Sequence, residues 1–325
     1  MTGAETVQEV HVWDSEEKRM YDIVIIGAGT AGLTAAVYGA RAGKSVLLLE
    51  ENVYGGQILS AAEVENYPGI RRISGYEFAE NLYRQALDLG AELKYEKALK
   101  IEEDGIGKTV HTNRGHHSGR TVILATGAKN RRLGLEREKE LTGSGISYCA
   151  TCDGAFYRGK DTAVVGGGNT ALEDTLFLSG YCSRIYLIHR RDRFRGEETM
   201  VRILQEKENV TILLESEIIR LNGDKHLESV LVKNTNSGKI QEFPVSALFI
   251  SVGQEPDNRG FSDLVQLDEQ GYVVSAENCH TGRKGFFSAG DCRTKEVRQL
   301  TTAASDGAVA ALAACAYINT SDSVS

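Results

Sequence analysis

The sequence predicts an α/β fold in which two strand–turn–helix units share one chain. A strand-length apolar run, a glycine-rich turn and a helix of small residues follow one another twice, and the two turns begin 139 residues apart, at Gly27 and Gly166. The 325 residues are about twice the length of an ordinary domain. The chain has 35 glycines but only 3 prolines, a surplus that indicates tight turns inside folded units rather than a flexible linker.

The first unit begins with the apolar run 21–26, which is typical of a parallel strand buried on both faces. A G-x-G-x-x-G turn follows at 27–32, then a helix at 33–42 and a second strand at 45–49. In such a turn the first glycine permits the bend, the second lets the backbone approach a pyrophosphate, and the third lets helix pack on strand. The N-terminus of the helix then attracts the phosphates, so the unit predicts a dinucleotide site.

Two acids, Glu50 and Glu51, follow the second strand. Glu50 stands eighteen residues after Gly32, where a carboxylate can accept hydrogen bonds from both ribose hydroxyls. The first unit therefore predicts a nucleotide with a free ribose, such as FAD or NAD.

The second unit repeats the pattern with a strand at 162–165, a G-x-G-x-x-A turn at 166–171, a helix at 172–178 and a strand at 184–188. His189, Arg190 and Arg191 follow the last strand in place of an acid. Guanidinium groups bind phosphate in a bidentate manner, whereas a carboxylate would repel it. The second unit therefore predicts binding of the 2′-phosphate of NADP, the alternative being a solvated strand end.

The order of the remaining strands predicts a domain inserted into another. A strand at 119–124 precedes the second unit, and a strand at 286–288, followed by a helix that extends to Ile318, comes after it. The simplest arrangement is a first domain of residues 21–130 and 254–325, interrupted by a second of residues 131–253. Residues 1–20 form a polar N-terminal extension to which no role is assigned.

The sequence contains one C-x-x-C pair, Cys149 and Cys152, directly before Asp153. A zinc site would need four ligands, and no second pair or histidine pair supplies them, so no metal is expected. A redox dithiol at a helix start is favoured over two inert buried cysteines. Asp153 can carry a proton to or from a leaving thiolate, or can serve as a helix cap or turn acid. The scattered cysteines, Cys182, Cys279, Cys292 and Cys315, are expected to be buried and inert.

The two nucleotide-binding units and the Cys149–Cys152 pair together predict a chain of electron transfer. Nicotinamide donates a hydride, a disulfide accepts two electrons, and flavin is the usual adaptor between them.

The net charge of −8 argues against nucleic-acid and anionic-membrane binding. The most apolar stretch, 307–318, is too short to span a bilayer and predicts a buried core helix. With no secretion signal and no disulfide framework, we expect a cytoplasmic protein.

Several motifs, in this order along the chain, resemble those of the low-molecular-weight bacterial thioredoxin reductases, which are pyridine nucleotide-disulfide oxidoreductases. The motifs are Gly27–Gly32, Gly55-Gly56-Gln57, Glu65-Asn66-Tyr67-Pro68-Gly69, Ala125-Thr126-Gly127, Cys149-Ala150-Thr151-Cys152-Asp153-Gly154, Gly166–Ala171, His189 to Arg195, and Gly290-Asp291 with Arg298-Gln299. The resemblance implies two Rossmann-like domains, a homodimer, electron transfer from NADPH through FAD to the Cys149–Cys152 disulfide, and thioredoxin as the partner. It also implies that Cys152 lies nearer the flavin and that the inserted domain rotates between two states.

The resemblance further implies the binding residues. FAD would be held by Gly27, Gly29, Thr30, Ala31 and Gly32 in the first turn, by Glu50, Glu51, Gly56, Gln57 and Asn66 beyond it, by Ala125, Thr126 and Gly127, and by Gly290, Asp291, Arg298, Gln299 and Leu300 near the other end. NADPH would be held by Gly166, Gly167, Gly168, Asn169 and Thr170 together with His189, Arg190, Arg191 and Arg195. The alternatives are a dithiol oxidase of the same fold, the reductase component of a peroxidase system, and a redox-sensing protein that binds nucleotide without turnover.

Overall fold

The computed structural model describes residues 19–61, 63–103, 105 and 107–322. Most of the polar extension expected at 1–20 therefore lies outside the described residues. The first strand begins at Met20.

One sheet collects strands from both ends of the chain. Its order is β3-β2-β1-β6-β5-β4, and β17 pairs with β6. The strands are β1 (Met20–Ile26), β2 (Val46–Glu50), β3 (Glu92–Tyr95), β4 (Ala98–Glu103), β5 (Lys108–Thr112), β6 (His116–Leu124) and β17 (Phe286–Ser288). The pairs β1–β2, β1–β6, β2–β3 and β6–β17 are parallel, whereas the pairs β4–β5 and β5–β6 are antiparallel. Strand β17 thus returns the chain to the sheet that it left after β6.

Apolar side chains alternate between the two faces of this sheet because successive strand residues point to opposite sides. Ile23 and Ile25 of β1 join a core with helices α1 (Thr30–Arg41) and α7 (Leu300–Asp322). Val24 and Ile26 join a second core on the other face. Helix α2 (Gly75–Asp88) packs on α1. The first unit is therefore buried on both faces, as its continuous apolar strand predicts.

A second sheet lies in the middle of the sequence, in the order β11-β10-β9-β15-β8 and with parallel pairs throughout. Its strands are β8 (Ile146–Ser147), β9 (Asp161–Gly166), β10 (Arg184–Ile188), β11 (Val210–Leu213) and β15 (Ala247–Ser251). Helices α5 (Asn169–Ser179) and α6 (Glu198–Gln205) cover one face. An antiparallel sheet of β12 (Ser216–Asn222), β13 (Ser229–Asn234) and β14 (Ile240–Pro244) covers the other.

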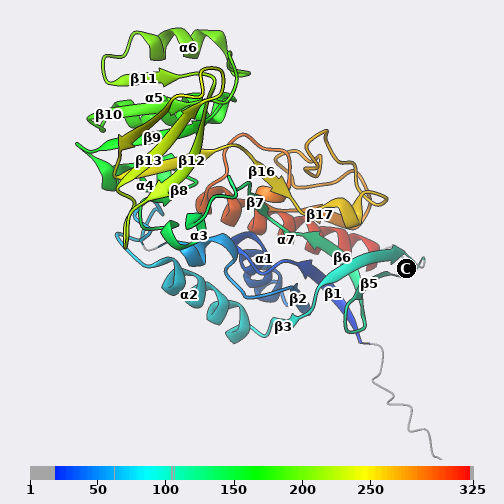
Figure 1. The fold of residues 1–325 in the computed structure, drawn as a ribbon. Helices are drawn as coiled ribbons and strands as arrows, with labels where there is room; N and C mark the ends of the chain where they lie inside the picture. The colour runs from blue at the N-terminus through cyan, green and yellow to red at the C-terminus, as the bar shows by residue number, and fades with distance from the viewer. Residues whose placement is uncertain (1–18, 62, 104, 106, 323–325) are drawn as a thin grey trace, which may run out of the picture.

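Two short strands stand where the chain passes between the sheets. These strands, β7 (Ala128–Asn130) and β16 (Gln254–Pro256), pair antiparallel with each other. Figure 1 shows them between the seven-stranded sheet below and the β9-containing sheet at the upper left. The short helices α3 (Glu138–Leu141) and α4 (Ala150–Asp153) follow the first crossing.

The α/β fold with two Rossmann-like units is confirmed, with one difference at the helix starts. Helices α1 and α5 begin at Thr30 and Asn169, three residues before the starts that the apolar pattern predicts. Each glycine turn supplies the N-cap itself, at Gly29 and Gly168, so the first helical turn is built from turn residues rather than from the apolar run.

Helix α7 is long and apolar enough, by length and composition, to cross a membrane. It packs along α1, and Ala310, Ala311, Ala314 and Ile318 are fully buried. These residues belong to the core on one face of the seven-stranded sheet, so α7 is a core helix, as the sequence predicts for 307–318.

Candidate active site

The first glycine turn leaves room for a ligand at the start of α1. Gly27 has a φ of 104°, which L side chains rarely adopt. A Cβ on Gly32 would lie 1.9 Å from the carbonyl oxygen of Gly27, so helix and strand approach as closely as the motif requires. No side chain caps α1 at Gly29, and the N–H groups of its first turn remain available to a phosphate.

Glu50 braces this turn. Its carboxylate accepts hydrogen bonds from the N–H of Ala28 at 2.9 Å and of Asn52 at 3.0 Å. A carboxylate oxygen can accept more than one hydrogen bond, so a ribose can still be bound here. The side chain therefore supports the turn and keeps the capacity to accept a further hydrogen bond.

Asp291 follows the other expected flavin-binding glycine, Gly290, in a short 3₁₀ turn. Its Oδ1 atom is buried and has no hydrogen-bond partner among the described residues. Burial raises the pKa of Asp291, while the positive charges of Lys295 and Arg298 oppose that shift. A buried acceptor without a partner is costly, and a ligand hydroxyl would satisfy it. The first turn and Asp291 thus fit a dinucleotide such as FAD.

Cys149 and Cys152 are joined by a disulfide whose Cα atoms lie 5.3 Å apart. Cys149 is the N-cap of α4, and Cys152 lies within that helix. Both sulfurs are used in the bond. Among the residues that the structure describes, no group of three or more metal-ligating side chains occurs. The pair therefore forms a disulfide in this structure.

The disulfide lies against residues from the other end of the chain. The amide nitrogen of Gln299 donates to the Thr151 hydroxyl at 3.0 Å and lies 3.8 Å from the Cys149 Sγ. The Gln299 amide oxygen lies 3.9 Å from the Cys152 Sγ and accepts a hydrogen bond of 3.2 Å from Asn66. Two residues expected to hold the flavin thus touch or support the redox pair.

Asp153 is held by a residue that the sequence analysis missed. The Ser147 hydroxyl donates to its Oδ2 at 2.6 Å, and the N–H of Cys149 donates to the same hydroxyl oxygen at 3.0 Å. Burial raises the pKa of Asp153, and the bond from Ser147 opposes the shift. Ser147 lies only two residues before the C-x-x-C motif, and this position is the one signal that could have identified it.

The second glycine turn, like the first, leads into a helix that no side chain caps. Gly168 is the N-cap of α5 and no side chain caps the helix. A Cβ on Gly166 would lie 2.3 Å from the carbonyl oxygen of Ser251, which shows how closely β9 and β15 approach. The first turn of α5 is thus open to phosphate in the same way as α1.

Three exposed arginines flank this turn: Arg190, Arg191 and Arg195. In the part of the chain that the structure describes, none of their guanidinium groups forms an ion pair with a carboxylate. The N–H of Arg195 donates to the carbonyl of Gly167 at 2.7 Å, which ties the arginine loop to the phosphate turn. The guanidinium groups of these three arginines fit a nucleotide that carries an additional phosphate.

His189 lies beneath the arginines rather than among them. It is 6% exposed, stacks on Phe194 at 5.2 Å, and has its Nε2 3.1 Å from the carbonyl oxygen of Arg193. Burial lowers its pKa, and repulsion from Arg191 adds to the effect. Its ring fills the space beside Gly167, where a Cβ would lie 2.0 Å from it.

The structure brings the disulfide, Asp153, Asn66 and Gln299 into one cluster. Among the described residues, no hydrogen bond or ion pair joins the second glycine turn or its arginines to that cluster. The expected flavin side of the site is therefore assembled in this arrangement, and the expected nicotinamide side is separate from it.

Two nucleotide-binding turns and a disulfide seated against one of the two sites define a flavin- and nicotinamide-dependent disulfide oxidoreductase. The family model of pyridine nucleotide-disulphide oxidoreductases matches residues 21–307. The chain belongs to this family, and within it to the low-molecular-weight thioredoxin reductases, as the sequence motifs predict. The family implies FAD and a nicotinamide dinucleotide as cofactors.

The individual similarities extend over almost the whole chain. A thioredoxin reductase of Treponema pallidum is 40% identical over 92% of this chain and 98% of its own. The crystal structure of a thioredoxin reductase from Streptococcus pyogenes superposes with a TM-score of 0.89 at 37% identity, covering 93% of this chain and 99% of that one. A Lactococcus lactis thioredoxin reductase in the FR conformation, 38% identical and covering 92% and 99%, gives a TM-score of only 0.64.

Proposed function

We propose that this chain transfers electrons from NADPH, through FAD and the Cys149–Cys152 disulfide, to thioredoxin or a thioredoxin-like protein. The observation that carries the proposal is the position of the disulfide against Gln299, whose side chain is hydrogen-bonded to Asn66. A disulfide packed against the residues expected at the flavin is in the right place to be reduced there.

The two sets of binding residues predicted from the sequence are proposed to hold the two cofactors. The unoccupied hydrogen-bonding capacity of Asp291 and the uncapped start of α1 support FAD at the first set. The uncapped start of α5 and the unpaired arginines beside it support NADPH at the second. FAD accepts a hydride equivalent from nicotinamide and passes two electrons to a disulfide.

A carboxyl group next to the disulfide can supply the proton that disulfide reduction requires. Opening of the Cys149–Cys152 bond produces a thiolate at one sulfur, and we assign Asp153 as the acid that protonates it. Burial raises the pKa of this carboxyl, which extends the pH range in which it holds a proton. Ser147 fixes its orientation.

We also propose that residues 131–253 rotate as one domain against residues 21–130 and 254–325. The two superpositions described above differ greatly in TM-score at nearly equal identity and coverage, which we attribute to a different orientation of the two units. The pairing of β7 with β16 supports a hinge at the domain crossings. Rotation would release the disulfide from Gln299 so that it can reach a protein partner.

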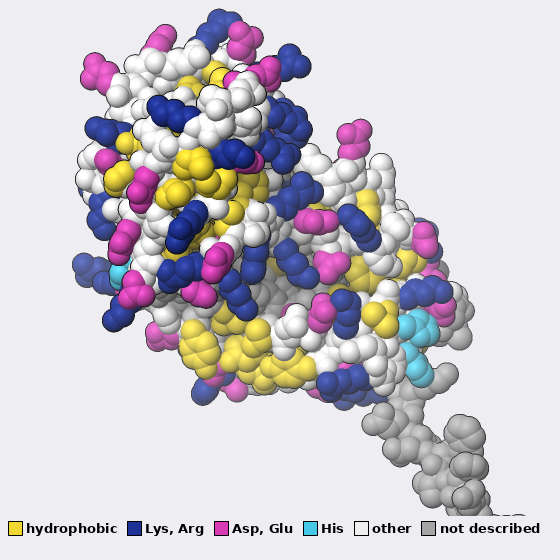
Figure 2. Space-filling model, viewed as in Figure 1, with side chains coloured by type: hydrophobic (Ala, Val, Ile, Leu, Met, Phe, Trp, Pro, Cys, Tyr) yellow, Lys and Arg dark blue, Asp and Glu magenta, His cyan; other side chains and the backbone are white. Residues whose placement is uncertain are grey.

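A cytoplasmic homodimer completes the proposal. Apolar side chains gather over the α2 segment at the lower edge of the face shown in Figure 2, and Tyr76 of that helix is 60% exposed. Exposed apolar surface of this kind is commonly covered in homodimers. Light scattering of the purified protein should give twice the monomer mass.

Anaerobic titration of the FAD-containing protein with NADPH tests the relay. FAD and a disulfide each accept two electrons, so complete bleaching should need roughly two equivalents per subunit. Cys149→Ser should reduce that number to roughly one, because the disulfide acceptor is lost. One equivalent for the unmodified protein would contradict the relay, and no bleaching would favour the dithiol oxidase. Bleaching without oxidation by added thioredoxin would exclude thioredoxin as the partner.

A further inference from the structure

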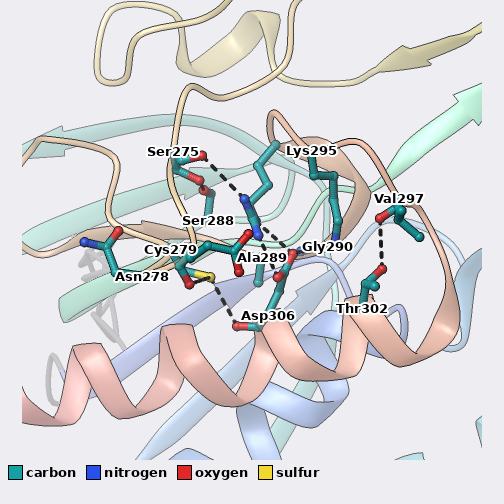
Figure 3. A network of polar contacts seen from close by, with 12 residues as sticks. Ser275, Asn278, Cys279, Ser288, Ala289, Gly290, Lys295, Val297, Thr302 and Asp306 are labelled. Atoms are coloured by element: carbon teal, nitrogen blue, oxygen red, sulfur yellow. Dashed lines mark hydrogen bonds and ion pairs between the residues drawn. The ribbon is translucent and has the colours of Figure 1, made fainter.

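We propose that Asp306 is a positioning residue that fixes the Gly290–Asp291 turn for FAD by collecting the Gly290 N–H and two buried cations around one carboxylate. The proposal rests on the assignment of this turn to FAD above. Figure 3 shows Asp306 on helix α7, directly beneath Gly290 and Lys295.

The carboxylate of Asp306 is fully engaged. Its Oδ2 accepts hydrogen bonds from the Gly290 N–H at 2.9 Å, the Arg293 Nε at 2.8 Å and the Lys295 Nζ at 2.8 Å, and its Oδ1 accepts from the second Arg293 nitrogen at 2.8 Å. Although burial alone would raise the pKa of Asp306, the bonds from Arg293 and Lys295 lower it overall. The residue is thus an ionised anchor for both cations and for the turn.

All three charged side chains are buried. The exposed fractions are 4% for Arg293 and 8% for both Lys295 and Asp306. Buried charges are retained only where partners compensate the loss of hydration. Two cations against one carboxylate leave one positive charge over, and the charge of Lys295 opposes the rise that burial causes in the pKa of the nearby Asp291. The charge of Lys295 thus lessens the cost of ionising Asp291, although burial and the charge of Asp306 raise the pKa of that carboxyl overall.

The cluster also lies where the two parts of the proposed FAD site meet. Gly307, the next residue of α7, approaches α1 so closely that a Cβ on it would lie 2.2 Å from the carbonyl oxygen of Ala31. Ala31 belongs to the first glycine turn, and a Cβ on Gly290 would lie 2.7 Å from the Ala31 side chain. Asp306 is thus hydrogen-bonded to the Gly290–Asp291 turn. The residue after it, Gly307, packs on the first glycine turn at Ala31.

A wider network holds the cations in place. The Arg293 guanidinium donates to the backbone carbonyl of Thr294 at 3.0 Å, and the Thr294 hydroxyl donates to the carbonyl of Ser275 at 3.0 Å. The Ser288 hydroxyl, at the end of β17, donates to the Ser275 hydroxyl at 2.8 Å. Because β17 leads directly into the Gly290–Asp291 turn, displacement of Arg293 would be transmitted to the turn from both sides.

The test measures how fast FAD leaves the holoprotein, followed by the increase in flavin fluorescence at a temperature well below unfolding. Asp306→Asn keeps the side-chain shape but removes the charge, and should speed FAD release about ten-fold or more. Its flavin absorbance spectrum should lose resolved structure as the site loosens. Asp306→Glu, which keeps the charge, should recover most of the slow release.

Asp174→Asn is the matched control, because it replaces a partly buried carboxylate of the second unit, hydrogen-bonded to Ser251 at 2.5 Å. It should leave FAD release unchanged. Release from Asp306→Asn within three-fold of the unmodified protein would overturn the proposal. If that variant does not fold, Lys295→Met, which leaves the Arg293 pair in place, decides by the same criterion. An unmodified protein that does not retain FAD would contradict the proposed function instead.

Discussion

Removal of the Ser147 hydroxyl should move the pH dependence of reduction of the Cys149–Cys152 disulfide to higher pH. In the structure this hydroxyl donates a 2.6 Å hydrogen bond to the carboxylate of Asp153 and accepts one from the Cys149 N–H. A donor stabilises the ionised carboxylate more than the neutral acid. Ser147→Ala should therefore raise the pKa of Asp153 further above the ordinary value from which burial already shifts it.

The size of the shift follows from the kind of bond. A hydrogen bond to a charged group contributes about 1.5–3 kcal/mol, and one pKa unit corresponds to about 1.4 kcal/mol. We therefore expect the pKa of Asp153 to rise by about one to two units. The protonated carboxyl is the form that serves as the acid, so the limb on which activity falls with increasing pH should move upward by the same amount.

The assay is the rate at which the Cys149–Cys152 disulfide is reduced after anaerobic mixing of the FAD-containing enzyme with NADPH, measured by stopped flow from pH 5.5 to 9.5. Ser183→Ala is the matched control, because that exposed hydroxyl donates to the Gly159 carbonyl at 2.8 Å in the same unit. Asp153→Asn should abolish the limb, and Ser147→Ala added to it should then have no further effect on the profile. An unchanged limb in Ser147→Ala, or a shift that persists in Asp153→Asn, would refute the reasoning.

Three further predictions concern the nucleotide specificity, the second unit and the contact between the units. Replacing Arg190 and Arg191 together by alanine should raise KM for NADPH at least about ten-fold with little change for NADH, and equal effects in steady-state kinetics would contradict the phosphate assignment. Burial raises the pKa of Asp174 from 3.8 to about 6, so its ionised form costs stability as pH rises. In denaturant unfolding, Asp174→Asn should stabilise the protein by about 3 kcal/mol at pH 8 and by under about 1 kcal/mol at pH 4; a gain independent of pH would count against this. Thr151→Val removes the acceptor of the Gln299 amide, so NADPH should reduce the flavin about five-fold faster, and an unchanged stopped-flow rate would show that this contact does not restrain the domains.

The parts of the site that are local in sequence were predictable. The glycine turns are fixed by backbone geometry, since Gly27 and Gly32 occupy positions where a side chain does not fit. The Cys149–Cys152 pair is recognisable because its spacing permits a disulfide across one helical turn. Each of these features depends on residues a few positions apart, and a pattern of residue types is enough to find it.

Contacts that join distant segments were not predictable. Gln299 meets Thr151 across 148 positions, and this depends on how the two units pack. The sequence analysis assigned no role to Asp306. Its role depends on β17 returning to β6, which brings Gly290, Arg293 and Lys295 over the second turn of α7. No spacing within α7 contains that information.

The two nucleotide-binding units differ in how each turn is braced, and this difference accounts for the free arginines. In the first unit the strand-end residue Glu50 accepts the N–H of Ala28 and so holds the turn itself. An arginine at the corresponding place has no acceptor to offer. In the second unit the turn is held by the Arg195 N–H, which donates to the Gly167 carbonyl. The buried ring of His189 packs beside Gly167 and supports the turn as well. Because backbone and imidazole hold the turn, the guanidinium groups need no partner within the protein and remain available to a phosphate.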